Sequence, residues 1–176
     1  MKSDDTPATR VSAAIASLGE AEVVERAIAL LAGFNAGEDF LLVAGGEHAK
    51  GILDGAPPLY WPEVWGARVL LYAWNDTAVD AVTAGLQNRA WRVREMCARV
   101  VGSRVLLAAA SVLRELLTDD VARVRAAGAR ALGEVGDVTD IDLLKHLFTD
   151  AEIDVRRAGQ QAIARIEARA AGSSAT

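Results

Sequence analysis

Few residues of this 176-residue chain carry side chains suited to catalysis or metal binding, and those few are scattered. The chain has one cysteine, Cys97, and two histidines, His48 and His146. No H-x-x-x-H pair or carboxylate cluster accompanies them, so their spacing does not predict a zinc site. Neither histidine is close to Cys97 in the sequence, which favours a buried structural thiol over a nucleophile. We therefore expect a protein without catalytic residues, metal or cofactor.

The segment FLLVAGGEHAKG, residues 40–51, allows two interpretations. An apolar run, a glycine pair and a following helix could surround a phosphate group. However, the segment lacks the G-x-G-x-x-G and G-x-x-x-x-G-K-[ST] spacings, and no alternation of strands and helices surrounds it. The neighbours Glu47 and His48 could act as an acid and a base, but nothing nearby completes such a site. We interpret the segment as two helices joined by a glycine hinge.

Arginines are the best candidates for a binding site because they recur at a regular spacing. Arg92 and Arg99 lie two helical turns apart. Each is followed by another arginine at the same spacing along the sequence. Acidic residues interrupt the row at Glu95, Glu134 and Asp154. The row is either a solvated face or a positive strip that contacts a partner. The arginines predicted to bind a partner are Arg92, Arg99, Arg123, Arg130, Arg157 and Arg165.

Three of the four tryptophans separate into two groups when they are compared at the same offset. Trp65 aligns with Met96 and Ala127, which predicts a position in the core. Trp61 and Trp91 align with polar or small residues, so they are either exposed anchors for a partner or a cover for an irregular turn. Interfaces are enriched in tryptophan, and we therefore include Trp61 and Trp91 among the candidate binding residues.

An internal repeat explains these alignments. The pairs Val93-Arg94, Val124-Arg125 and Val155-Arg156 are evenly spaced along the chain, and their spacing is the period of the repeat. Apolar or small residues follow each valine at positions +3, +4, +7 and +8, which is the buried stripe of an amphipathic helix. A second helix is predicted over residues 105–117 in one unit and about 139–148 in the next. A single helix pair cannot bury both apolar faces, so the pairs must stack on their neighbours.

The segments DDVARVRAAGARALGEVGD (119–137) and DAEIDVRRAGQQAIARI (150–166) resemble HEAT repeats, especially the short HEAT-like repeats first recognised in phycobilisome lyase proteins. The resemblance implies an all-α fold, a right-handed α-solenoid of about five antiparallel helix pairs whose second helices line a concave surface. HEAT repeats place an aspartate six positions before an arginine, and each arginine is expected to bind the aspartate of its own or the adjacent repeat. Here the predicted structural ladder contains Asp119, Arg125, Asp150, Arg156 and Arg94, which Asn88 precedes.

The predicted organisation has three parts. Residues 1–55 form an N-terminal helical cap, with helices over 7–18 and 20–32 that end at Gly19 and Gly33. Residues 56–171 form the repeats, at about 56–86, 87–117, 118–148 and 149–171. Residues 172–176 form a frayed tail.

Composition and charge narrow the class of protein. Hydrophobic residues make up 52% of the chain and 35 residues are alanine, which favours a globular helical protein. The net charge of −5 makes nucleic acid an unlikely partner. No apolar run reaches the roughly 18–20 residues that span a bilayer. The single cysteine and the polar start MKSDDTPATR predict a cytoplasmic protein.

The sequence therefore predicts a non-catalytic scaffold or adaptor that binds an unidentified protein, with an acidic segment as the best match to the arginines. Two alternatives stay open. One is binding of a nucleic-acid phosphate backbone, as in the HEAT-like alkylpurine glycosylases. The other is a subunit of a lyase-type enzyme. The sequence predicts no oligomeric state.

Overall fold

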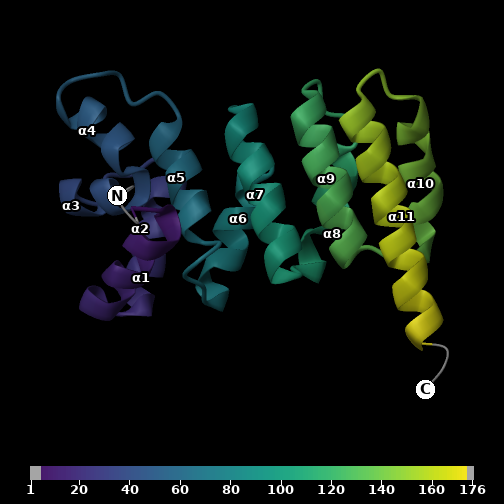
Figure 1. Ribbon diagram of the computed structural model, residues 1–176, viewed down its shortest axis with the longest axis horizontal. Helices are drawn as coiled ribbons and strands as arrows, with labels where there is room; N and C mark the ends of the chain where they lie inside the picture. The colour runs from purple at the N-terminus through teal and green to yellow at the C-terminus, as the bar shows by residue number, and fades with distance from the viewer. Residues whose placement is uncertain (1–4, 174–176) are drawn as a thin grey trace. The chain divides into compact units, whose positions relative to one another are not determined.

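The structure is a computed structural model that describes residues 5–173, and every regular element in that part of the chain is helical (Figure 1). The predicted all-α class is thereby confirmed. The right-handed superhelix and the number of about five pairs stay predictions. The chain divides into two compact units, Met1–Gly85 and Leu86–Thr176, which we call unit 1 and unit 2.

Unit 1 begins with a well-capped helix. The hydroxyl of Thr6 accepts a hydrogen bond from the backbone N–H of Thr9 at 3.2 Å, and Pro7 occupies the first helical position. The predicted helices over 7–18 and 20–32 are confirmed to within one residue. The elements are α1 (Pro7–Leu18), α2 (Glu20–Leu31), α3 (Glu38–Gly45), α4 (Glu47–Leu53), α5 (Trp61–Val69), η1 (Asp76–Ala78) and α6 (Val79–Gly85).

The core of unit 1 lies where α5 packs against α2 and α3. Gly66 makes the α2–α5 contact close, because a Cβ atom at this position would lie 2.6 Å from the backbone oxygen of Ala27. Phe40 on α3 is completely buried. The predicted division into a cap of residues 1–55 and repeats of residues 56–171 stays a prediction. Helix α5 follows residue 55 in the chain but belongs to the same compact unit as α2, because the two helices share this core.

The segment over residues 40–51 is a helix, a glycine turn and a helix, as the sequence indicated. Helix α3 ends at Gly45 and α4 begins at Glu47. The residue between them, Gly46, has a φ of +60°, a conformation that side-chain-bearing residues rarely adopt. This turn places α4 and the loop that follows it near α5, which is important for the pocket described below.

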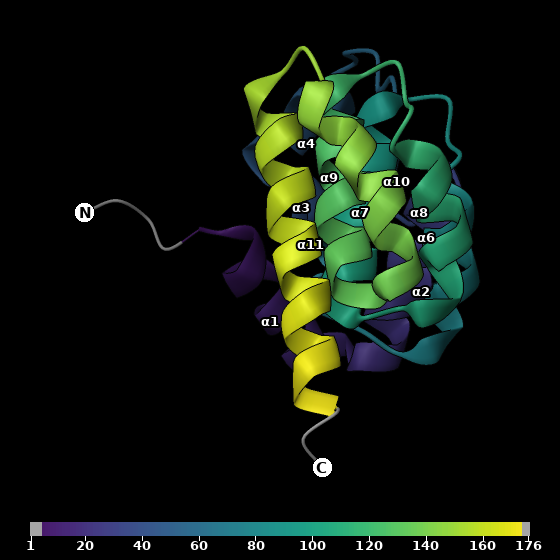
Figure 2. The same cartoon turned by 90° about the vertical axis from the view of Figure 1, so that its right-hand side faces the viewer.

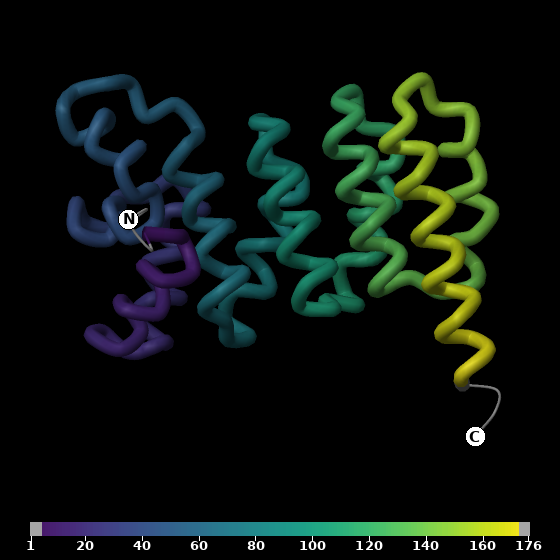
Figure 3. Tube along the Cα trace, viewed as in Figure 1, coloured from purple at the N-terminus to yellow at the C-terminus, as the bar shows by residue number. Residues whose placement is uncertain are grey.

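Unit 2 consists of two layers of helices (Figures 1 and 2). Helices α7, α9 and α11 pack side by side in one row, while α8 packs against α9 and α10 packs against α11. The tube in Figure 3 shows the chain passing from one layer to the other and back. The elements are α7 (Trp91–Arg104), η2 (Leu107–Ala109), α8 (Ala110–Leu116), α9 (Ala122–Val135), η3 (Val138–Asp140), α10 (Ile141–Lys145), η4 (His146–Thr149) and α11 (Ile153–Ser173).

The pairing of these helices differs from the predicted repeat boundaries. The boundaries 87–117 and 118–148 place α8 in one repeat with α7, and α10 in one repeat with α9. In the structure α8 packs mainly against the helix that follows it, and α10 does the same. The spacing of the Val-Arg pairs gives the length of a repeat. It does not give the residue at which a repeat begins.

Small residues allow the helices of unit 2 to approach each other. A Cβ atom at Gly128 would lie 2.9 Å from the Cβ of Leu116 on α8, and one at Gly133 would lie 2.8 Å from the Cα of Ala162 on α11. The repeated valines Val93, Val124 and Val155 are completely buried in this packing. The predicted tail begins inside α11, at Gly172, and residues 174–176 lie outside the described part of the chain. Among residues 5–173, no helix combines the length and apolar character needed to cross a membrane.

Candidate functional site

Two repeated arginines bind the aspartate of the next repeat through two parallel hydrogen bonds. In Arg94, Nε lies 2.7 Å from Oδ2 of Asp119 and Nη2 lies 2.9 Å from Oδ1. Arg125 and Asp150 repeat both distances. The third nitrogen, Nη1, donates in each case to a backbone oxygen six residues earlier, at 2.8 Å from Asn88 for the first arginine and from Asp119 for the second. These arginines tie neighbouring turns together, which is a structural role.

The third arginine of this series makes only the backbone half of the contact. Nη1 of Arg156 donates to the backbone oxygens of Asp150 at 2.6 Å and Ala151 at 3.0 Å. In the part of the chain that the structure describes, no carboxylate forms an ion pair with Arg156. The first repeat also differs, because Asn88 stands where the later repeats have aspartate.

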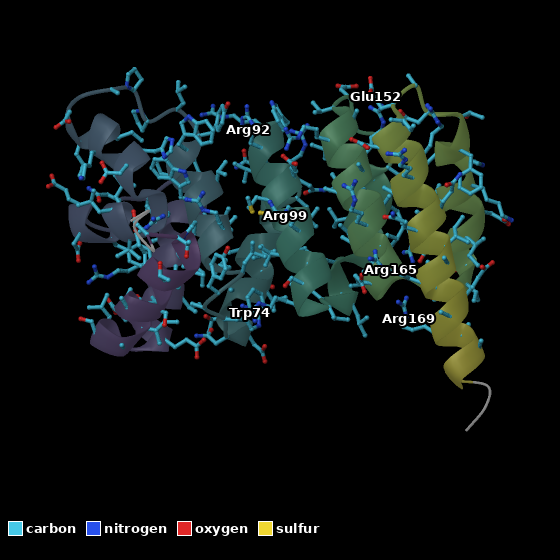
Figure 4. All side chains as sticks on the ribbon, in the orientation of Figure 1. Trp74, Arg92, Arg99, Glu152, Arg165 and Arg169 are labelled. Carbon is cyan, nitrogen blue, oxygen red and sulfur yellow. The ribbon has the colours of Figure 1, made fainter. Side chains whose placement is uncertain are left out.

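Arg99 and Arg130 occupy the same position on the neighbouring helices α7 and α9, and both side chains are exposed. Figure 4 labels Arg92 and Arg99 along α7. On α9, Gly128 contacts α8, and Arg130 lies two residues further along the helix, about 200° around its axis. The two arginines therefore lie on the face opposite α8. Within residues 5–173, neither arginine forms an ion pair.

A second group of predicted residues forms a compact cluster at the start of the same helices. The guanidinium carbon of Arg92 lies 4.3 Å from the ring centre of Trp91, and that of Arg123 lies 5.6 Å from it. Arg123 also forms an ion pair with Glu95 at 3.2 Å. The structure thus brings three predicted binding residues together. Glu95, which interrupts the row in the sequence, thus pairs with one of its arginines.

The far end of the row is less basic than predicted. Arg165 on α11 forms an ion pair with Glu134 on α9 at 3.2 Å, while Arg157 is exposed. Asp154 stands where α7 and α9 carry Arg92 and Arg123. A hollow of about 470 Å³ between the first turns of α9 and α11 is lined by residues of both charges, including Glu152, Asp154, Arg123 and Arg130. Among the predicted arginines in the described part of unit 2, Arg99 on α7 and Arg130 on α9 are thus exposed and form no ion pair.

Trp61 lies on α5, outside unit 2. It belongs to unit 1, where its ring centre lies 5.4 Å from that of Tyr60 and 6.3 Å from that of Trp65. Trp65 is only 4% exposed, which confirms its predicted place in the core. Sequence reasoning grouped Trp61 with Trp91 because both align with polar or small residues of the repeat. Sequence reasoning missed Arg68, which lies one turn after Trp65 and lines a pocket together with both tryptophans.

The potential catalytic groups lie on different helical elements. Cys97 is completely buried on α7, and burial raises the pKa of its thiol to about 12, so it is protonated at neutral pH. His48 lies on α4 in unit 1, and His146 is exposed at the end of α10 in unit 2. Among residues 5–173, no group of three or more His, Cys, Asp or Glu side chains is arranged to hold a metal ion.

The comparisons with known proteins agree with the repeat pattern. A search of curated proteins finds no significant match. A family model described as HEAT repeats matches residues 79–164, just under half of the chain. The match starts at the first residue of α6 and ends inside α11, so it includes every valine-arginine pair. HEAT repeats commonly mediate protein–protein interaction and are generally non-catalytic. The repeat region of this chain thus matches HEAT repeats, in agreement with the family indicated by its Val-Arg spacing.

Proposed function

We propose that the chain is a non-catalytic protein-binding module in which the exposed face of α7 and α9 holds an acidic segment of a partner protein. The observation that carries the proposal is the pair Arg99 and Arg130. These side chains recur at one repeat position, are exposed, and form no ion pair within the described residues. In solenoids of this kind, we expect this face to be the concave binding surface.

Two of the acidic residues near these arginines already have ion-pair partners, while Glu152 and Asp154 line a hollow together with Arg130. Glu95 is paired with Arg123, and Glu134 is paired with Arg165. Each of these two glutamates thus has a cation of its own on an adjacent helix. Arg99 and Arg130 remain able to form charge-assisted hydrogen bonds with carboxylates supplied by a partner.

The spacing of the helices indicates the backbone conformation of the partner. Packed helices are about 8–10 Å apart, and α7 and α9 are close because a Cβ atom at Gly102 would lie 3.2 Å from the Cα of Ala131. A polyproline II segment rises about 3.1 Å per residue and repeats every three residues, so equivalent side chains recur about every 9 Å. A partner with an acidic residue at every third position in this conformation would match both arginines.

The position of Trp91 also fits a proline-rich partner segment on α7 and α9. Its ring lies beside Arg92 and Arg123 at the start of α7, on the helix that carries Arg99. Proline-rich segments commonly pack against aromatic side chains. We also propose that the repeats are of the short phycobilisome lyase type. This proposal concerns architecture and adds no catalytic role.

The test uses two fluorescent peptides with the same backbone, one repeating Glu-Pro-Pro and the other repeating Gln-Pro-Pro. Fluorescence anisotropy measures their binding to the full chain at several salt concentrations. We expect the acidic peptide to bind and the neutral peptide to bind at least about tenfold more weakly. The double variant Arg99→Glu/Arg130→Glu should abolish binding of the acidic peptide.

The matched control is Arg89→Glu/Lys145→Glu, which changes the net charge by the same amount at exposed positions elsewhere in unit 2. This control should bind the acidic peptide almost as well as the unaltered chain. Equal binding of both peptides, or full binding by Arg99→Glu/Arg130→Glu, would contradict the proposal. Tighter binding of duplex DNA than of the acidic peptide, with a steep dependence on salt, would favour a nucleic-acid partner instead.

A further inference from the structure

We propose that unit 1 contains a binding pocket for a small planar aromatic carboxylate, between α4 and α5. The pocket has a volume of about 410 Å³, within the range of about 300–1,000 Å³ that is typical of small-molecule sites. Helix α4, the loop that follows it and one face of α5 surround the pocket. Its main lining residues are His48, Ile52, Pro57, Trp61, Trp65 and Arg68.

The aromatic wall of the pocket is held in place by the core of unit 1. Trp61 and Trp65 are one turn apart on α5, and their rings are stacked with an angle of 26° between them. Trp65 is fixed by close packing, since a Cβ atom at Gly45 would lie 2.5 Å from its ring. Trp61 is partly exposed at the pocket. Flat aromatic walls favour a planar ring, because stacked or tilted ring pairs stabilise each other beyond simple burial.

The polar side chains that line the pocket indicate which polar group a ligand would carry. Arg68 continues the face of α5 that carries both tryptophans, and its Nη2 donates to the backbone oxygen of Ala44 at 2.7 Å, which holds the guanidinium group beside the pocket. His48 provides a second nitrogen-bearing side chain from α4. Among the described residues that line the pocket, none is an aspartate or a glutamate. Arginine binds carboxylates through directional hydrogen bonds, so the pocket fits an anionic aromatic ligand better than a cationic one.

Helix α4, which follows Gly46 and carries His48, forms part of the pocket wall. The glycine turn between α3 and α4 directs α4 towards α5, and His48 and Ile52, one turn apart on α4, line the pocket opposite the tryptophans. The pocket lies entirely within unit 1.

The test compares three probes with the same ring and different charges: indole-3-acetate, tryptophol and tryptamine. Isothermal titration calorimetry and ligand-observed NMR measure their binding to the full chain. We expect indole-3-acetate to bind at least about tenfold more tightly than neutral tryptophol, and the cation tryptamine to bind most weakly. Equal affinities for the three probes, or no binding of any probe, would overturn the proposal.

Two variants locate the site. Arg68→Gln should lower the affinity for indole-3-acetate to that for tryptophol, and should leave the affinity for tryptophol unchanged. Gly51→Phe places a ring at the pocket from a position on α4 where a new Cβ meets nothing within 4 Å, so it should block all probes without unfolding the chain. Arg89→Gln and Gly172→Phe are the matched controls, and both should bind like the unaltered chain. Undiminished binding by Gly51→Phe would refute this location.

Discussion

Units 1 and 2 are both helical and both contain turns closed by a side chain, such as the one at Asn75 in unit 1, but they differ in how they use glycine. Unit 1 uses glycines with positive φ, at Gly19, Gly33, Gly37, Gly46 and Gly55. In the described part of unit 2, no glycine has a positive φ. The turns before α7, α9 and α11 are instead closed by side chains. Asn88, Asp119 and Asp150 each accept a hydrogen bond from the backbone N–H two residues later, at 2.8, 2.8 and 2.9 Å.

This difference helps to explain why the period is clearest in the sequence of unit 2. A glycine turn needs only one permissive residue, so its neighbours are free to vary. A side-chain turn of unit 2 also supplies the carboxylate that an arginine of the preceding repeat binds. The turn and the inter-repeat contact therefore share one aspartate, and both recur together with the period of the repeat. We expect unit 2 to depend on contacts between helices, and the turns of unit 1 to depend on backbone conformation.

Among the variants that test this difference between the units, Gly128→Leu is expected to have the largest effect on stability. The new side chain would overlap Leu116 on α8, where a Cβ atom alone already comes within 2.9 Å. We expect the free energy of unfolding to fall by about 3 kcal/mol. Urea unfolding followed by circular dichroism measures the loss, and the labelling rate of the buried Cys97 reports the opening of unit 2. Gly172→Leu, on a helix position with nothing within 4 Å, is the control and should be neutral. A neutral Gly128→Leu would mean that α8 and α9 do not pack in this way.

The next largest effect is expected from Asp150→Ala. This change removes the carboxylate that accepts two hydrogen bonds from Arg125 and one from the N–H of Glu152. Because the side chain of Asp150 is only 10% exposed, we expect a loss of about 2 kcal/mol in the free energy of unfolding. Asp142→Ala serves as the control, since its ion pair with Lys145 is largely exposed and should contribute little. Equal losses for both variants would show that the ladder does not stabilise unit 2.

A smaller effect is expected from Gly19→Ala in unit 1. The residue has φ +87° and ψ 151°, a region that residues with a Cβ atom rarely enter. No other atom lies within 4 Å of the new methyl group, so the cost arises from the backbone alone. We expect a loss of about 1 kcal/mol in the free energy of unfolding. Thermal unfolding measures this loss, and the labelling rate of Cys97 in unit 2 should stay unchanged. A faster labelling rate would show that the stability of unit 2 depends on this turn of unit 1.

The smallest effect is expected from pH. The hydrogen bond from Arg125 is the main cause that lowers the pKa of Asp150, with the N–H of Glu152 acting in the same direction. An aspartate with a lowered pKa stabilises the fold fully above its unfolded pKa of about 4, and this contribution is lost as the pH falls through the folded pKa. The variant compared with the unaltered chain is Asp150→Asn. Its amide oxygen can still accept the hydrogen bond that closes the turn, but the side chain carries no charge. Urea unfolding at pH 7 and pH 3 should show the difference between this variant and the unaltered chain narrowing at pH 3. A constant difference would exclude a role for the charge.

The predictions from sequence were accurate where a structural feature depends on neighbouring residues. The apolar stripe after Val93, Val124 and Val155 indicated three helices, and all three form. The cap at Thr6 and the turn at Gly46 were likewise local features. The pairing of α8 with α9 could not be read from the period, because a periodic sequence looks the same from any starting point.

The sequence by itself determined the helices, their period and the family that they match, because helix formation and a repeated apolar stripe depend on residues a few positions apart. Only the tertiary structure decided which arginines are already paired. Glu95 and Arg123 lie on different helices, as do Glu134 and Arg165, so their contacts exist only when neighbouring helices pack. The pocket at Trp61 and Arg68 has the same origin, since α4 must lie near α5 before a cavity forms between them.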